Sequence, residues 1–76
     1  MKEKLRIMIR TLAQHHYSTD TILRAILLSA NANETEVVMD RIIELTNQTK
    51  TERELLDKIE EIEEKENIKE WYYESN

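Results

Sequence analysis

The chain contains neither glycine nor proline among its 76 residues. Glycine supplies most of the left-handed backbone that tight turns require, and proline interrupts helices and central strands. A chain without either residue is well suited to helices that are joined by short turns. The fold class predicted from this feature is all-α, in a single domain that spans residues 1–76.

The spacing of apolar residues predicts four helices, at about residues 3–16, 19–30, 34–47 and 52–74. The segment 3–16 places Leu5, Met8, Ile9 and Leu12 on one face. The segment 19–30 is apolar around nearly its whole circumference, which is typical of a central helix. We therefore expect a compact bundle, with a tri-helical core and a long acidic C-terminal helix.

Polar residues between these segments predict where the helices start and stop. The start signals are Ser18 or Thr19, the pair Asn33 and Glu36, and the pair Thr51 and Glu54. The two pairs have the spacing of a capping box, in which a side-chain oxygen accepts a hydrogen bond from a free backbone N–H group. Asparagine tolerates left-handed backbone, so Asn31 and Asn33 are expected to end the second helix in place of glycine.

A core of this size leaves little net stability, and the chain has no cysteine for a disulfide. A dimer or a complex is therefore expected, with the apolar seam of Leu55, Ile59 and Ile62 as the dimer contact.

His15 and His16 are adjacent, and side chains one position apart on a helix point about 100° apart. No further ligands complete a zinc site, so neither a metal nor a cofactor is expected.

Charge divides sharply along the chain. Residues 1–32 hold five bases and two acids (+3), residues 33–76 hold six bases and fourteen acids (−8), and the sum is −5. The expected acidic face consists of Glu60, Glu61, Glu63 and Glu64. Such a face suits a partner protein with a basic surface, including one that normally binds nucleic acid. The aromatic cluster Trp71, Tyr72 and Tyr73 either covers the core or anchors the partner.

Several other classes of function are not favoured. A glycine-rich phosphate loop is impossible in this chain, and its three serines lie in no nucleophile motif. The charged N-terminus lacks the apolar stretch of a signal peptide, and no apolar run approaches the length of a membrane span. A cytoplasmic protein without enzyme activity and without membrane insertion is expected. Its size and acidity would suit a phage-like accessory protein.

Residues 18–29, Ser-Thr-Asp-Thr-Ile-Leu-Arg-Ala-Ile-Leu-Leu-Ser, resemble the first helix and turn of a helix-turn-helix motif. The resemblance implies that the helix at 34–47 reads DNA and that the C-terminal helix dimerises. The bases available for DNA contact are Lys2, Lys4, Arg6, Arg10, Arg24 and Arg41. However, the helix at 34–47 carries four acids and one base, and such a surface repels phosphates.

Three hypotheses therefore remain in this order. The first is a small regulatory or adaptor protein that binds another protein through charged helical faces and inhibits, for example, a nucleic-acid-binding protein. The second is a DNA-binding regulator with a helix-turn-helix. The third is a purely structural helical oligomer.

Overall fold

The computed structural model describes residues 2–66, and these form four α-helices. The helices are α1 (Lys2–Gln14), α2 (Thr19–Asn31), α3 (Thr35–Gln48) and α4 (Glu52–Glu66). The predicted all-α class is confirmed, and the first three helices end within about two residues of their predicted bounds. The predicted extension of α4 to residue 74 and the cluster Trp71, Tyr72 and Tyr73 lie outside the described residues.

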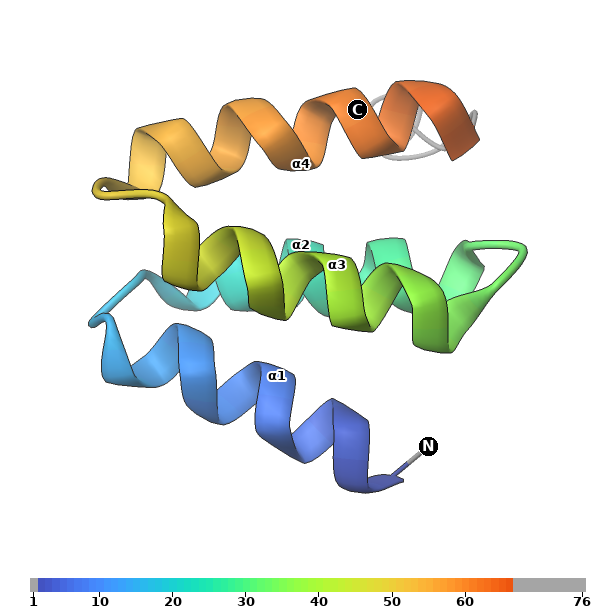
Figure 1. Ribbon diagram of the computed structural model, residues 1–76, viewed down its shortest axis with the longest axis horizontal. Helices are drawn as coiled ribbons and strands as arrows, with labels where there is room; N and C mark the ends of the chain where they lie inside the picture. The colour runs from blue at the N-terminus through green and yellow to red at the C-terminus, as the bar shows by residue number, and fades with distance from the viewer. Residues whose placement is uncertain (1, 67–76) are drawn as a thin grey trace.

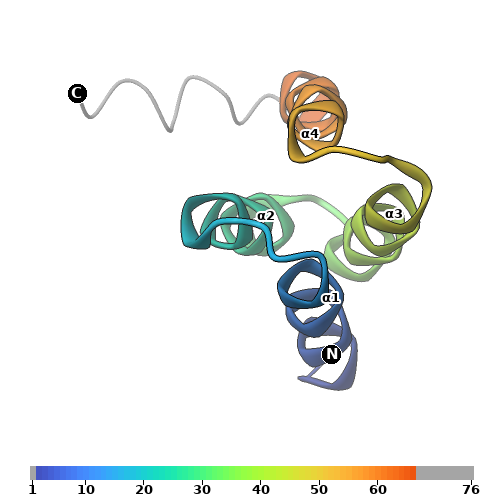
Figure 2. The same cartoon turned by 90° about the vertical axis from the view of Figure 1, so that its left-hand side faces the viewer.

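Successive helices run back and forth along the long axis of the molecule (Figure 1). Seen nearly end-on, α2 and α3 form a central pair, with α1 on one side of that pair and α4 on the other (Figure 2). Within the described chain, α1 and α4 do not contact each other, whereas both of them contact α2 and α3. The central position predicted for the most apolar helix, α2, is therefore shared with α3.

The arrangement of α2 and α3 differs from a helix-turn-helix. In that motif the two helices cross at about 90–120°. Here α2 and α3 lie side by side and run in nearly opposite directions (Figures 1 and 2). The resemblance of residues 18–29 to the motif therefore reflects a capped helix followed by a turn, and it does not extend to the packing of the pair.

The turn between α1 and α2 combines two local signals. His16 has a φ of 61°, and the backbone N–H groups of His16 and Tyr17 donate to the carbonyls of Ala13 and Leu12. These two bonds form a Schellman motif, which normally places glycine at the left-handed position. Ser18 then caps α2, because its hydroxyl accepts a hydrogen bond from the N–H of Thr21 at 3.3 Å. The predicted Ser18 cap is confirmed.

The other two start signals have different outcomes. Thr51 accepts a hydrogen bond from the N–H of Glu54 at 3.2 Å, as predicted for the start of α4. The predicted cap at Asn33 is wrong, because Glu34 occupies the N-cap position of α3 and makes no side-chain cap bond. The predicted left-handed backbone at Asn31 or Asn33 is also wrong, since neither residue has a positive φ and Ala32, the C-cap of α2, is extended.

The core receives side chains from all four helices. Its fully or almost fully buried apolar residues are Met8, Leu12, Ala25, Leu28, Val38, Met39, Ile42, Leu45, Leu55 and Ile59. Leu55 and Ile59 are therefore enclosed within a single copy of the chain, and Ile62 packs against the same cluster. Leu55 and Ile59 are therefore not exposed for contact with a second copy, whereas Ile62 is only half-buried. Whether the chain forms a dimer stays a prediction.

An ion pair inside the fold joins α2 to α4. The guanidinium of Arg24 donates from Nε to Oε2 of Glu63 at 2.8 Å and from Nη2 to Oε1 at 2.6 Å. Glu63 is completely buried, while Arg24 retains 24% of its exposure. A two-pronged bond of this kind satisfies both carboxylate oxygens. The prediction that Glu63 belongs to a solvated acidic face is therefore wrong.

Two further carboxylates of α4 bind groups at the two ends of α2. Glu52 accepts hydrogen bonds from the backbone N–H of Ser18 at 3.0 Å, from the Ser18 hydroxyl at 2.8 Å and from the Thr21 hydroxyl. At the other end of α4, Glu66 accepts from the N–H of Asn33 at 3.1 Å. With Glu63 between them, these acids attach α4 to α2 along its length.

The hydrogen bonds of Glu52 make the fold sensitive to acid. Bonding to Thr21 and to Ser18 lowers the pKa of Glu52 below its ordinary value of 4.5. A lowered pKa contributes stability above the ordinary value, and this stability is lost as the pH falls through the pKa of the folded state. We expect Glu52→Gln to cost about 1 kcal/mol at neutral pH, since the site is partly solvated, and clearly less at about pH 3, below the ordinary pKa of the carboxyl.

Urea unfolding followed by circular dichroism at both pH values would check this prediction. Thr21→Val serves as the matched variant, because it removes the hydroxyl that contributes most to the lowered pKa. In that background Glu52→Gln should have a smaller effect on the free energy of unfolding. If the difference in the free energy of unfolding between the wild type and Glu52→Gln stays the same from neutral to acid pH, the proposed role of the carboxylate is contradicted.

Candidate functional site

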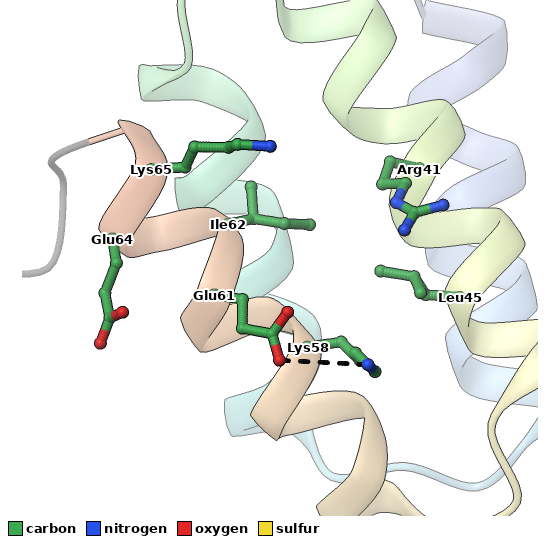
Figure 3. Close-up of a pocket in the computed structure, with 7 residues that line it drawn as sticks. All are labelled: Arg41, Leu45, Lys58, Glu61, Ile62, Glu64 and Lys65. Carbon is green, nitrogen blue, oxygen red and sulfur yellow. Dashed lines mark ion pairs between the residues drawn. The ribbon is translucent and has the colours of Figure 1, made fainter.

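A groove of about 540 Å³ lies between α3 and α4 on the surface of the molecule. Its lining residues are Arg41, Leu45, Lys58, Glu61, Ile62, Glu64 and Lys65. Figure 3 shows Arg41 and Leu45 projecting from α3 toward Ile62 and Lys65 of α4. We refer to this surface as the α3–α4 groove.

The floor of the α3–α4 groove is apolar. Leu45 retains 5% of its exposure, and Ile62 is half-buried where it packs against the core. Leu45 lies one turn beyond the core residue Ile42, and Ile62 lies three residues beyond the core residue Ile59. The regular 3.6-residue period of each helix thus places the almost fully buried Leu45 and the half-buried Ile62 at the floor of the groove.

The rim of the groove is charged and mostly cationic. Arg41 forms an exposed ion pair with Glu44 at 2.9 Å, and Lys58 lies 4.0 Å from Glu61. Among residues 2–66, no carboxylate forms an ion pair with Lys65. Glu64 points away from the groove, whereas Lys58 and Lys65 extend over it (Figure 3). Exposed ion pairs of this type are worth less than about 1 kcal/mol, so they exchange readily with groups of a ligand.

This combination of groups is suited to binding. The lining contains Arg, Lys, Glu, Leu and Ile, and therefore has no hydroxyl, thiol or imidazole that could act as a nucleophile beside a base. An apolar floor with charged groups around it matches the way in which grooves between helices hold a segment of another protein. An apolar side chain of the ligand would lie between Leu45 and Ile62, and its carboxylates would meet the cations of the rim.

The structure distributes the four predicted acidic residues over different surroundings. Glu61 and Glu64 line the α3–α4 groove, while Glu63 is buried against Arg24. Glu60 is half-buried and lines a smaller hollow of about 210 Å³ on another face of α4, together with Arg24 and Leu56. The four acids therefore do not form the single continuous face that the sequence suggested.

The six bases predicted for DNA contact also separate into two groups. Lys4 bonds to Asp40 at 3.0 Å, and that bond raises the pKa of Lys4. Arg24 is bound to Glu63 and Arg41 to Glu44, so half of the predicted set is already paired within the chain. The remaining three bases are Lys2, Arg6 and Arg10, which are exposed on α1.

From the sequence, Lys58 and Lys65 were expected only to support the helix through i, i+4 pairs with Glu54 and Glu61, and the groove was not predicted. The signal that was available is the spacing along α4, where Lys58, Ile62 and Lys65 recur at intervals of four and three residues and so share one face. That pattern is also typical of an ordinary exposed helix edge. The pattern indicates a groove only when the fold places Arg41 and Leu45 of α3 opposite this face of α4.

Two further sequence expectations concern metals and membranes. Within residues 2–66, no three side chains of His, Cys, Asp or Glu gather as metal ligands would. His15 instead places Nδ1 at 2.9 Å from the carbonyl of Thr11, and its ring lies against Tyr17. Among the described helices, none has the length and apolar character needed to span a membrane.

Comparisons with protein-family models, with curated proteins and with solved structures found no match to this chain. The assignment of a function therefore depends on the geometry and chemistry of the chain itself.

Proposed function

We propose that this chain is a non-catalytic protein-binding module, an adaptor or regulator that holds a segment of another protein in the α3–α4 groove. The observation that carries the proposal is the apolar floor of Leu45 and Ile62 with Arg41, Lys58 and Lys65 around it. A helix or an extended segment with one apolar anchor and flanking carboxylates has the complementary chemistry.

The other two hypotheses receive less support. A DNA-reading role would require cations on α3 that face outward and are free, whereas the outward face of α3 carries Glu36, Asp40 and Glu44. Lys4 and Arg41 lie among these same acids and are paired with them. Mimicry of nucleic acid by a row of carboxylates on α4 is weakened by the burial of Glu63 and by the cations that share that helix.

Site-specific photo-crosslinking tests the proposal directly. A benzophenone amino acid placed at position 65, on the rim of the groove, should crosslink to a defined partner protein in cells that express the chain. The same amino acid at position 50, an exposed position in the turn that precedes α4, is the matched control. We expect the crosslinked product from position 65 and not from position 50.

The partner identified in this way is then purified and its affinity measured by calorimetry. Arg41→Glu should weaken binding by about tenfold or more, because it reverses a rim charge that faces the carboxylates of the partner. Lys50→Glu changes the net charge by the same amount away from the groove and should leave the affinity nearly unchanged. Equal affinities of the two variants, or equal crosslinking from both positions, would refute a docking role for the groove.

A further inference from the structure

The outward face of α1 combines free cations with partly uncovered apolar side chains. Lys2, Arg6 and Arg10 line a shallow hollow of about 420 Å³ together with Leu5 and Ile9. The three bases recur every four residues, so they form a row that rises about 6 Å from one base to the next. We call this surface the α1 strip.

The cations of the α1 strip differ from the other bases of the first three helices. Lys4, Arg24 and Arg41 each bind a carboxylate of the chain, at 3.0, 2.6 and 2.9 Å. Among residues 2–66, no hydrogen bond or ion pair is recorded for the side chains of Lys2, Arg6 or Arg10. All three are exposed to solvent. Their charge is therefore available to a ligand without the loss of an internal bond.

The apolar part of the α1 strip is also incompletely covered. Met8 and Leu12 fill the core side of α1, whereas Leu5 and Ile9 remain half-buried at its edge. Leu5 packs against the core, whereas Ile9 is not among the half-buried residues that pack against it. A hollow that is floored by these two side chains offers apolar contact directly beside the row of bases.

We propose that the α1 strip is a second docking surface, and that it binds an acidic amphipathic segment of a protein partner. Apolar side chains of that segment lie on Leu5 and Ile9, and its carboxylates pair with Lys2, Arg6 and Arg10. The strip and the α3–α4 groove belong to different sides of the molecule, because α1 and α4 flank the central pair and do not touch (Figure 2). Both surfaces can therefore be occupied at once, which makes the chain a bridge between two partners.

Charge complementarity favours a protein segment over a nucleic acid. Each phosphate that a base neutralises adds to the affinity for a duplex, and the strip supplies only three bases for this purpose. Beside the strip, Lys4 is surrounded by Glu36 and Asp40 of α3, so a duplex that extended past α1 would meet carboxylates. A phosphate backbone offers no apolar group that could fill the hollow, whereas the apolar face of an amphipathic helix does.

A designed peptide serves as the probe for this proposal. The peptide is a capped helix of about four turns, with leucines at i, i+3, i+4 and i+7 and glutamates on either side of them. Titrated into the full-length ¹⁵N-labelled protein, it should shift the amide signals of α1, and these shifts should persist in the Arg41→Glu variant, in which binding to the α3–α4 groove is weakened. A second peptide, in which serine replaces each leucine, should bind at least tenfold more weakly.

Matched charge variants complete the test. Arg6→Glu should reduce affinity for the leucine peptide by about tenfold or more, and Lys50→Glu, with the same change in net charge, should not. Circular dichroism verifies that both variants remain folded. The proposal is overturned if the two variants bind equally, if the shifts map to other helices, or if a labelled duplex of about 20 base pairs binds more tightly than the peptide at about 150 mM salt.

The outcome is independent of the α3–α4 groove. Arg41→Glu should leave binding of the leucine peptide to the strip unchanged, even though it is expected to abolish most of the binding to the groove. Loss of peptide binding in Arg41→Glu would show that the peptide occupies the groove, and this result would overturn the proposal for α1 while leaving the groove as a docking site.

Discussion

Replacing Arg24 by alanine is expected to lower the free energy of unfolding by about 3–5 kcal/mol. The reason is that the substitution removes both hydrogen bonds to a carboxylate that has no exposure to water. A natural domain has only about 5–15 kcal/mol of stability in total, so a large part of the population would unfold near the upper limit of this loss. Urea denaturation followed by circular dichroism measures the effect.

The partner substitution should cost less. In Glu63→Ala the guanidinium left behind can turn toward solvent, because Arg24 already retains 24% of its exposure. The double substitution Arg24→Met with Glu63→Leu removes both charges and fills the space with apolar groups, and buried pairs replaced in this way often lose no stability. We expect its stability to lie within about 1 kcal/mol of the wild type. A double variant as unstable as Arg24→Ala would show that the pair does not act as a unit.

Replacing Ile59 by alanine is expected to destabilise the chain by about 2–4 kcal/mol without changing its oligomeric state. Ile59 is completely buried within one copy of the chain, so the substitution leaves a cavity in the core. The free energy of unfolding measures the first effect, and sedimentation velocity at matched concentrations measures the second.

Leu23→Ala is the control for this prediction. Leu23 lies on α2 and retains 51% of its exposure, so removal of its side chain should change stability by less than about 0.5 kcal/mol. If Ile59→Ala instead converted a dimer into monomers and Leu23→Ala did not, the seam of α4 would have to contact a second copy, and the packing described here would be wrong at that position.

The number of helices and most of their ends could be predicted from sequence because they depend on local physics. A 3.6-residue apolar period fixes the inner face of each helix, and Ser18 and Thr51 cap helices through bonds that span only three residues. His16 shows the limit of this approach. Its left-handed backbone follows from the closure of the turn onto α2. Histidine and asparagine are both enriched in left-handed backbone, so residue type alone did not favour His16 over Asn31 or Asn33.

The errors concerned long-range partners. Glu63 has acidic neighbours in the sequence and looks like one more solvated acid, and only Arg24, 39 positions earlier, brings it inside. The seam of Leu55 and Ile59 has the same pattern whether it covers a core or a second copy of the chain, because a helix presents the same stripe to either. The groove could not be predicted for a related reason. It is formed by side chains of both α3 and α4, and the sequence of either helix alone does not show that they face each other.

The three carboxylates that attach α4 to α2 also determine which parts of the sequence control partner choice. Ser18, Arg24 and Asn33 line no part of the α3–α4 groove, yet their bonds to Glu52, Glu63 and Glu66 fix where α4 stands relative to α3. The distance between α3 and α4, the two walls of the groove, therefore depends on the bonds between α4 and α2, which lie outside the groove. Selection for a different partner can act on α2 and its flanking turns, and so alter the fit without changing a single residue that the partner touches.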